Sequence, residues 1–211
     1  MRHESVGRPR SSSRNTLEDA ALELFLEQGY SSTTIEHITR RAGVSRNTFF
    51  NYFEAKSDLL WLEVDAGIDR MAEELDAVPL DVSPIATLRD VMVRVADEVG
   101  ADRVPLALTQ GEVMRSQGEA VTSGLTRFAR RADVLAGFLA PRFGTVRNDL
   151  AILAASNALA GAISAAWEVW ARDGISRRPL ADYVAEAFDL VVTGVAGSLD
   201  RRFPRSTHRE Q

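Results

Sequence analysis

The sequence predicts an all-α protein with about nine helices. Apolar residues recur at the three- and four-residue spacing of an α-helix over most of the 211 residues. No stretch keeps the strict alternation of a half-buried strand, and no repeat of fixed period is present. Glycine, proline and serine mark most of the breaks between the helical stretches, which is where helices usually start and stop.

The elements follow from these patterns in order. Residues 1–14 form a polar arm rich in Ser and Arg, which we expect to be disordered when free or to contact a DNA minor groove. Gly29 ends the first helix. Ser83 and Pro84 stand in the order favoured at a helix start, and residues 141–144 separate two later helices. The expected helices are 15–28, 34–42, 45–53, 55–77, 84–100, 106–117, 120–139, 148–172 and 179–199.

Composition argues against several function classes. Apolar residues make up 45% of the chain and charged residues 26%, which is ordinary for a globular protein. There is no Cys, so disulfides and thiolate metal sites are excluded. His3, His37 and His208 are scattered along the chain. We therefore expect no metal site, no cofactor and no enzyme activity.

The sequence also gives little indication of a signal peptide or a membrane-spanning helix. The N-terminus lacks the apolar stretch of a signal peptide. Residues 150–167 carry no charged side chain, and a stretch of this length is the shortest that could form a membrane-spanning helix. This stretch is dominated by Ala and contains Asn157, so a helix buried between other helices is the better interpretation. We expect a cytoplasmic protein with no membrane partner.

One stretch, 33–56, has the pattern of a helix-turn-helix. It reads TTIEHITRRAGVSRNTFFNYFEAK. Thr34 opens a short helix, Gly43 ends it, and Ser45 caps a second short helix. In this motif the second helix enters the major groove of DNA. The net charge of −5 does not favour nucleic acid, but the arm before Asn15 is locally basic.

The second short helix predicts which residues contact double-stranded DNA. Phe49 and Phe53 share an inward face, which leaves the polar residues and Phe50 outside. Arg and Asn side chains match guanine and adenine edges, and hydroxyls near helix starts suit phosphates. Lys56, the only lysine, is expected to hold a phosphate at the start of the next helix. The expected contacts are Thr33, Thr34, Ser45, Arg46, Asn47, Thr48, Phe50, Asn51, Tyr52 and Lys56.

The first sixty residues resemble the TetR family of bacterial transcriptional regulators. The run TTIEHITRRAGVSRNTFFNYFEAKSDLL carries the resemblance. It implies a homodimer with N-terminal DNA-binding domains and larger ligand-binding domains behind them, usually repressing nearby genes until an effector binds. Phe50 stands where many relatives have Tyr, which removes one phosphate hydrogen bond. A narrower similarity, at 48–61 and 65–71, is to regulators linked to mycofactocin and acyl-CoA-like ligands.

We divide the chain accordingly into an arm (1–14), a helix-turn-helix domain (15–60, motif about 33–53), a ligand-binding and dimerisation domain (61–200) and a tail (201–211). A near-palindromic operator requires a two-fold dimer. The last two helices are the expected interface, through Ala154, Ala155, Ala158, Ala162 and Ala165 in one and Phe188, Val191, Val192, Val195 and Leu199 in the other.

The large side chains of the middle helices are candidates for an effector pocket. These are Trp61, Met92, Met114, Phe128, Trp167 and Trp170. Five arginines could receive an anionic ligand: Arg94, Arg115, Arg127, Arg130 and Arg131. A ligand that tilts the helix from Ala55 would separate the two reading helices and release the operator. A regulator that answers to a protein partner, and an activator, remain as alternatives.

Overall fold

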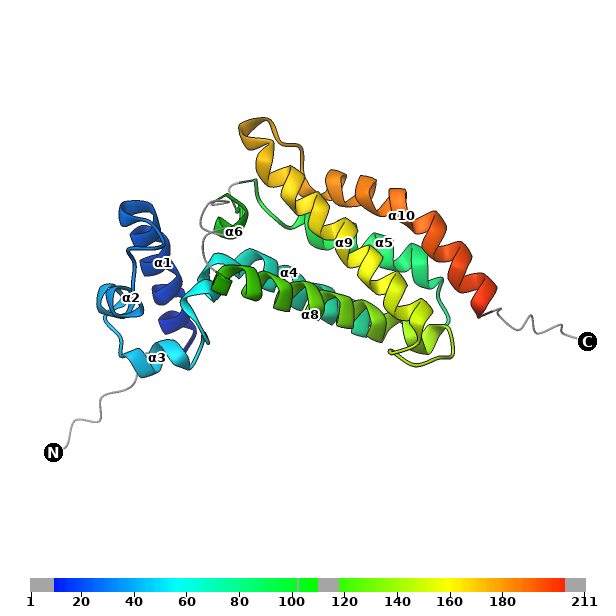
Figure 1. Cartoon of the computed structure of the whole chain (residues 1–211), viewed down its shortest axis with the longest axis horizontal. Helices are drawn as coiled ribbons and strands as arrows, with labels where there is room; N and C mark the ends of the chain where they lie inside the picture. Colours follow the sequence, from blue (N-terminus) through cyan, green and yellow to red (C-terminus); the bar gives the residue numbers. More distant parts are fainter. Residues whose placement is uncertain (1–9, 102, 110–117, 204–211) are drawn as a thin grey trace, which may run out of the picture.

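The computed structural model describes residues 10–101, 103–109 and 118–203, and within these ranges the chain is all-α. They form nine α-helices and two short 3-10 helices, and contain no strand. This confirms the predicted fold class. Figure 1 shows a small N-terminal group of helices beside a longer bundle.

The three-helix head consists of α1 (Arg10–Gln28), α2 (Ile35–Ala42) and α3 (Arg46–Phe50). The expected small core is present. Its fully or largely buried members come from all three helices and the chain just after them: Leu17, Leu24, Phe25, Ile38, Phe49 and Phe53. Ile35 and Val44 pack against this core. Helices α2 and α3, of eight and five residues, are too short to be stable alone, so the shared core holds the head together.

The first helix starts earlier than expected, and the prediction of a flexible arm was wrong for residues 10–14. Ser13 is buried, and Arg14 pairs with Glu18 while its guanidinium lies 5.6 Å from the centre of the Phe53 ring. The burial of Ser13, the ion pair within the helix and the contact with Phe53 extend the helix into a polar stretch that has no helical periodicity. Residues 1–9 of the arm and 204–211 of the tail lie outside the described residues.

The predicted helix 55–77 is two elements. The 3-10 helix η1 (Lys56–Leu60) is followed by Trp61, with φ −116° and ψ 11°, and then by α4 (Leu62–Asp76). One oxygen of Asp58 accepts hydrogen bonds from the main-chain N–H groups of Glu54 and Ala55, both at 2.9 Å. This cap fixes the tight first turn, and the burial of Leu59, Leu60 and Trp61 favours the break over a straight helix.

The helical body comprises α4 and the elements that follow it. They are α5 (Pro84–Asp97), α6 (Leu106–Thr109), α8 (Gly118–Arg142), α9 (Leu150–Arg172), η2 (Gly174–Ser176) and α10 (Leu180–Arg202). Helix α9 packs against both α8 and α10, and α5 packs against α10. In Figure 1, α4 and α8 lie side by side along one edge of the body. The end of α8 runs through Pro141, slightly beyond the expected stop.

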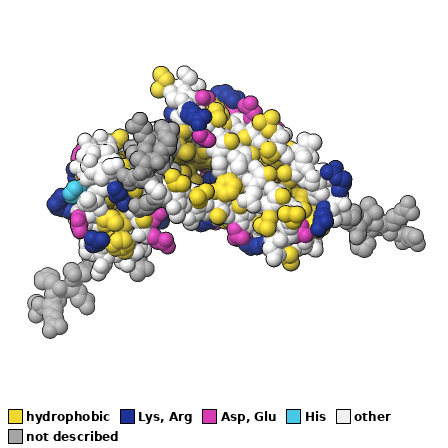
Figure 2. Space-filling model, viewed as in Figure 1, with side chains coloured by type: hydrophobic (Ala, Val, Ile, Leu, Met, Phe, Trp, Pro, Cys, Tyr) yellow, Lys and Arg dark blue, Asp and Glu magenta, His cyan; other side chains and the backbone are white. Residues whose placement is uncertain are grey.

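Helix α9 is long and apolar enough to cross a membrane by length and composition alone. Half of its most apolar window is buried inside the protein, as in the core helix of a helical bundle. The rest contributes to an exposed apolar surface on the body, where Figure 2 shows hydrophobic side chains gathered.

Candidate nucleic-acid interface and ligand cavity

Two capping side chains and one glycine define the ends of α2 and the start of α3. Thr34 caps α2 by accepting the N–H of His37 at 3.1 Å. Gly43 adopts φ 66°, a left-handed conformation that favours glycine, and so ends α2. Ser45 caps α3 by accepting the N–H of Thr48 at 3.1 Å. The result is a helix, a tight turn and a second helix, as the sequence predicts.

Helix α3 has one buried face and one exposed face. Phe49 is fully buried, whereas Arg46, Asn47 and Asn51 are exposed. Phe50 is 46% exposed, with its ring edge-on to Phe49 at 5.4 Å between centroids. An Arg, two Asn and an aromatic ring on one short exposed helix are groups that can contact base edges and a thymine methyl.

Arg46 is held in place before any DNA is bound. Its guanidinium donates to Glu36 of α2 at 2.9 Å and lies 5.5 Å from the centre of the Phe50 ring. Both charged side chains are exposed, and exposed ion pairs contribute about 0–1 kcal/mol. A phosphate or a guanine can therefore replace Glu36 at small cost.

The hydroxyl candidates fall into two groups. Thr34 and Ser45 are exposed caps, Thr48 is half-buried with its hydroxyl 2.9 Å from that of Ser45, and Tyr52 is half-buried. Thr33 is different, since it is only 1% exposed. Its hydroxyl donates to the Gly29 carbonyl at 2.8 Å, inside the head. The structure gives Thr33 a role in packing instead of the expected phosphate contact, because its side chain has turned inward.

Lys56 is also directed inward. Its ammonium donates to the carbonyls of Tyr30 and Thr33, both at 2.8 Å, and lies 3.8 Å from the centre of the Tyr30 ring. These contacts fasten the connection between α1 and α2 onto η1. The sequence predicts a phosphate contact at Lys56, and the structure adds a structural role that no local pattern indicates.

Three of the six ligand candidates line one cavity. Trp61, Phe128 and Trp167 surround a volume of about 270 Å³ together with further side chains of α4, α6, α8 and α9. Met92 lines a neighbouring small cavity of about 30 Å³, and Val64, Arg131 and Trp167 line both cavities. Trp170 is fully buried and donates its indole N–H to the Arg178 carbonyl, so it belongs to the core. Met114, like Arg115, lies outside the described residues.

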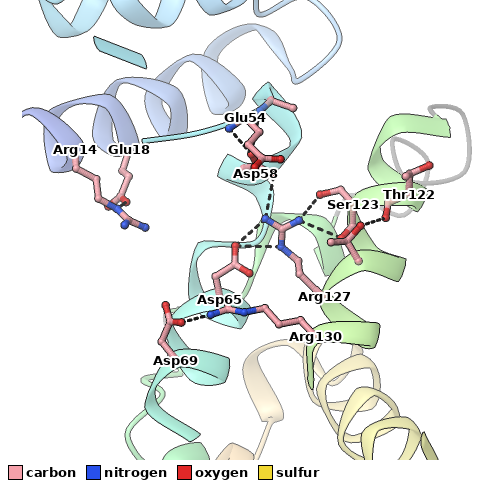
Figure 3. Close-up of polar contacts among 12 residues, drawn as sticks. Arg14, Glu18, Glu54, Asp58, Asp65, Asp69, Thr122, Ser123, Arg127 and Arg130 are labelled. Carbon is pink, nitrogen blue, oxygen red and sulfur yellow. Dashed lines mark hydrogen bonds and ion pairs between the residues drawn. The ribbon is translucent and has the colours of Figure 1, made fainter. Parts of the chain in front are cut away.

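Arg127 connects this cavity to the head. It lines the cavity, and its guanidinium donates to Asp58 of η1 at 3.1 Å and to Asp65 of α4 at 2.7 Å. Figure 3 shows it between these two carboxylates, with Ser123 as a further partner. Burial raises the pKa of Asp65, while the hydrogen bond and charge of Arg127 act in the opposite direction.

Two of the other arginines are paired on the surface. Arg94 pairs with Glu74, and Arg130 pairs with Asp69 (Figure 3). Arg131 is only 6% exposed and lines the cavity. It donates to the Ser164 hydroxyl at 3.0 Å and has no ion pair among the described residues.

The expected dimer surface is split by the fold. Ala154, Ala158 and Ala165 of α9 are exposed, but Ala155 and Ala162 are buried within the chain. In α10 the expected residues pack inward: Phe188 and Leu199 are buried, and Val191, Val192 and Val195 lie against the core. The exposed apolar residue of α10 is Leu190, at 81%, near Gly194. Of the residues expected in α10, only the half-buried Val191, Val192 and Val195 therefore keep surface that a partner could contact, because Phe188 and Leu199 are used in the chain's own core.

Two residues were missed altogether. Glu36 holds Arg46, and Asp58 joins the cap of η1 to Arg127. The spacing of Ala55 and Asp58, a carboxylate three residues into a helix start, is a signal that could have located the cap. Within the residues that the structure describes, no group of His, Asp or Glu is placed to hold a metal ion.

A capped helix-turn-helix with an exposed reading face, attached to an all-α body with a cavity, defines a helix-turn-helix transcriptional regulator. Two models of known protein families match the chain. Residues 17–61 match the model for bacterial regulatory proteins of the tetR family, and residues 82–196 match the MftR C-terminal domain. The chain belongs to the TetR family of DNA-binding transcriptional regulators, with a C-terminal domain of the MftR type, which confirms the resemblance.

Similar proteins include other regulators. The mycofactocin biosynthesis transcriptional regulator MftR of Mycobacterium tuberculosis is 28% identical over 198 residues, covering 92% of this chain and 98% of the relative. The regulator HbdR of Aromatoleum sp. is 28% identical over 192 residues, covering 85% and 79%.

Among solved structures, FadR of Thermus thermophilus, a TetR-family repressor in complex with lauroyl-CoA, is 27% identical with a TM-score of 0.58, covering 86% of this chain and 94% of FadR. FadR of Bacillus subtilis in complex with stearoyl-CoA has the same TM-score at 23% identity, covering 86% and 98%, and so shares the fold.

Proposed function

We propose that this chain is a cytoplasmic repressor that binds a near-palindromic operator as a homodimer and leaves it when a small apolar or acyl-CoA-like effector occupies the body. The exposed face of α3 carries the DNA-binding half of this proposal. Arg46 and Asn47, with Phe50 beside them, project from a helix whose other face is locked into the head core. The reading residues are therefore presented on a rigid support.

The dimer half rests on the exposed apolar side chains of the last two helices. Leu150, Leu153, Ala154, Ala158 and Ala165 follow one another along α9 at helical spacing. Leu190 is the corresponding exposed residue of α10. A contiguous apolar surface of this kind is typical of a protein interface, and two helices from each chain would form a four-helix bundle. Such a dimer would carry two copies of α3 to half-sites about 34–36 Å apart.

The effector half rests on the cavity and on the relatives. The FadR structures contain lauroyl-CoA and stearoyl-CoA, and the cavity wall here is largely aromatic and aliphatic. An apolar chain would replace water against Trp61, Phe128 and Trp167, which is favourable at roughly 25 cal/mol for each Å² buried.

A physical path joins this cavity to α3. Arg127 lines the cavity and holds Asp58, and the other oxygen of Asp58 caps the main chain at Glu54 and Ala55, just after α3. A ligand that moves α8 relative to α4 would pull on this connection. It would thereby change the angle of the head and the distance between the two reading helices.

A gel shift with DNA from upstream of the protein's own gene tests the proposal. We expect a sequence-specific complex that acyl-CoAs or other apolar compounds dissolve. Equal binding to every DNA sequence would overturn the repressor assignment. A specific complex that no small molecule affects, together with no thermal stabilisation by any of them, would instead favour a regulator that answers to a protein partner. Increased transcription from the bound promoter would indicate an activator.

A further inference from the structure

Two arginines one helical turn apart on α8 line the same cavity, but only one of them forms ion pairs among the described residues. Arg127 has two carboxylate partners, Asp58 and Asp65. Arg131 is more deeply buried and has only the Ser164 hydroxyl. That hydroxyl donates onward to the Ala160 carbonyl, so it accepts from Arg131 without supplying a negative charge.

The nearby carboxylates are already engaged. Asp65 pairs with Arg127, and Glu168 at the cavity pairs with Arg172. Burial lowers the pKa of Arg131 to about 10, and the charge of Asp65, which acts in the opposite direction, offsets only part of this effect, so Arg131 remains protonated at neutral pH. A buried cation without an ion-pair partner of its own is costly unless something pairs with it.

The rest of the cavity is suited to an apolar body. Trp61, Val64, Leu108 and Phe128 form its wall, and the exposed Leu125 and Glu168 mark a side that is open to solvent. The indole N–H of Trp61 is buried and has no hydrogen-bond partner among the described residues, so a second donor in this wall is unused. The volume of about 270 Å³ equals roughly nine water molecules at about 30 Å³ each.

We propose that this cavity binds an apolar monocarboxylate of about medium-chain length, with the carboxylate paired to Arg131 and the hydrocarbon against the aromatic wall. The carboxylate supplies the ion-pair partner that Arg131 lacks among the described residues, and Arg can bind both of its oxygens. This inference rests on the proposed function, since it names the chemical class of the effector. It differs from binding of an acyl-CoA, whose thioester carbonyl carries no charge.

Calorimetric titration of the full chain, without DNA, tests this proposal. The probes are octanoate, octanol and octanoyl-CoA. We expect octanoate to bind about tenfold or more tightly than octanol, because only the acid pairs with the guanidinium. Equal binding of the acid and the alcohol, or binding of octanoyl-CoA alone, would overturn the carboxylate assignment. This comparison needs no variant.

Variants locate the site. Arg131→Met should remove the preference for octanoate and leave octanol binding in place, while the protein without ligand becomes no less heat-stable because an unpaired buried charge is gone. Arg130→Met, on the exposed face of the same turn, should keep the preference. An Arg131→Met protein that still prefers octanoate would refute the proposal. That result would leave the proposed function standing, because release of the operator by acyl-CoA does not depend on it. Octanoate binding by a protein that binds no DNA would refute the proposed function and leave the carboxylate site standing.

Discussion

Some side chains of the head face solvent, and others hold its helices together. Arg46 is the clearest example of the first group. It rests on Phe50 and Glu36 in the free protein. We expect Arg46→Ala to cost about 1–3 kcal/mol at the operator and to weaken discrimination at one base position. Binding of operator variants by fluorescence anisotropy would measure both effects.

Glu36→Gln is the matched control for this experiment. It frees Arg46 from its ion pair and removes a negative charge beside the reading face. Affinity should therefore rise for all sequences, most at low salt. If Arg46→Ala and the unmodified protein discriminate equally well, Arg46 does not contact a base.

Lys56 belongs to the fastening group. Replacing it with Met removes two hydrogen bonds from an ammonium to main-chain carbonyls. Hydrogen bonds to charged groups contribute about 1.5–3 kcal/mol, and we expect the free energy of unfolding to fall by about that amount. Chemical denaturation followed by circular dichroism measures this change. Weaker DNA binding at unchanged stability would instead support the phosphate contact that the sequence suggests.

At the scale of elements, the break between η1 and α4 is the junction on which regulation depends. Asp58 caps η1 with one oxygen and holds Arg127 with the other. Asp58→Asn can keep a carbonyl oxygen for the cap, but it presents an amide to Arg127 and loses the ion pair. Coupling between sites is typically about 1–3 kcal/mol, and we expect the ratio of DNA affinities with and without effector to approach one in this variant.

Asp69→Asn is the control for that variant. It breaks another pair between α4 and α8, with Arg130, further from η1. Operator binding with and without effector should be measured for both variants. Loss of the effector response in both would mean that general contact between α4 and α8 matters, and that the Asp58 connection has no special role.

At the scale of the whole molecule, the exposed surface of α9 and α10 defines the expected assembly. Leu190→Glu places a charge at the most exposed apolar residue of α10. We expect it to produce monomers in sedimentation and to weaken operator binding by about 100-fold or more, because the second head then contributes nothing. Leu80→Glu, an exposed leucine in the loop between α4 and α5, should leave the dimer intact.

A dimeric Leu190→Glu protein with normal DNA affinity would contradict this assignment of the interface. The expected result would also separate the two tasks of α10. Phe188 and Leu199 hold it to the rest of the body, while Leu190 faces outward.

The sequence alone determined the fold class, the helix-turn-helix and the residues of its exposed face. These depend on local rules: Thr34 and Ser45 cap the helices that directly follow them, Gly43 allows a left-handed turn, and Phe49 is one of the apolar residues that set the buried face. The family resemblance lies in this same stretch. Local rules also placed most helices to within a few residues of their observed bounds.

The tertiary structure alone decided what the charged residues of the interior do. The carbonyls that hold Lys56 lie 26 and 23 residues away in sequence, and the carboxylates of Arg127 lie 69 and 62 residues away. No periodicity records such pairings, because they depend on how separate helices pack. The same packing leaves Arg131 in the cavity with a hydroxyl partner and no ion pair among the described residues, and turns Leu190 outward. The sequence indicates what this protein binds through α3, and the packing of its helices indicates where a ligand and a second copy would fit.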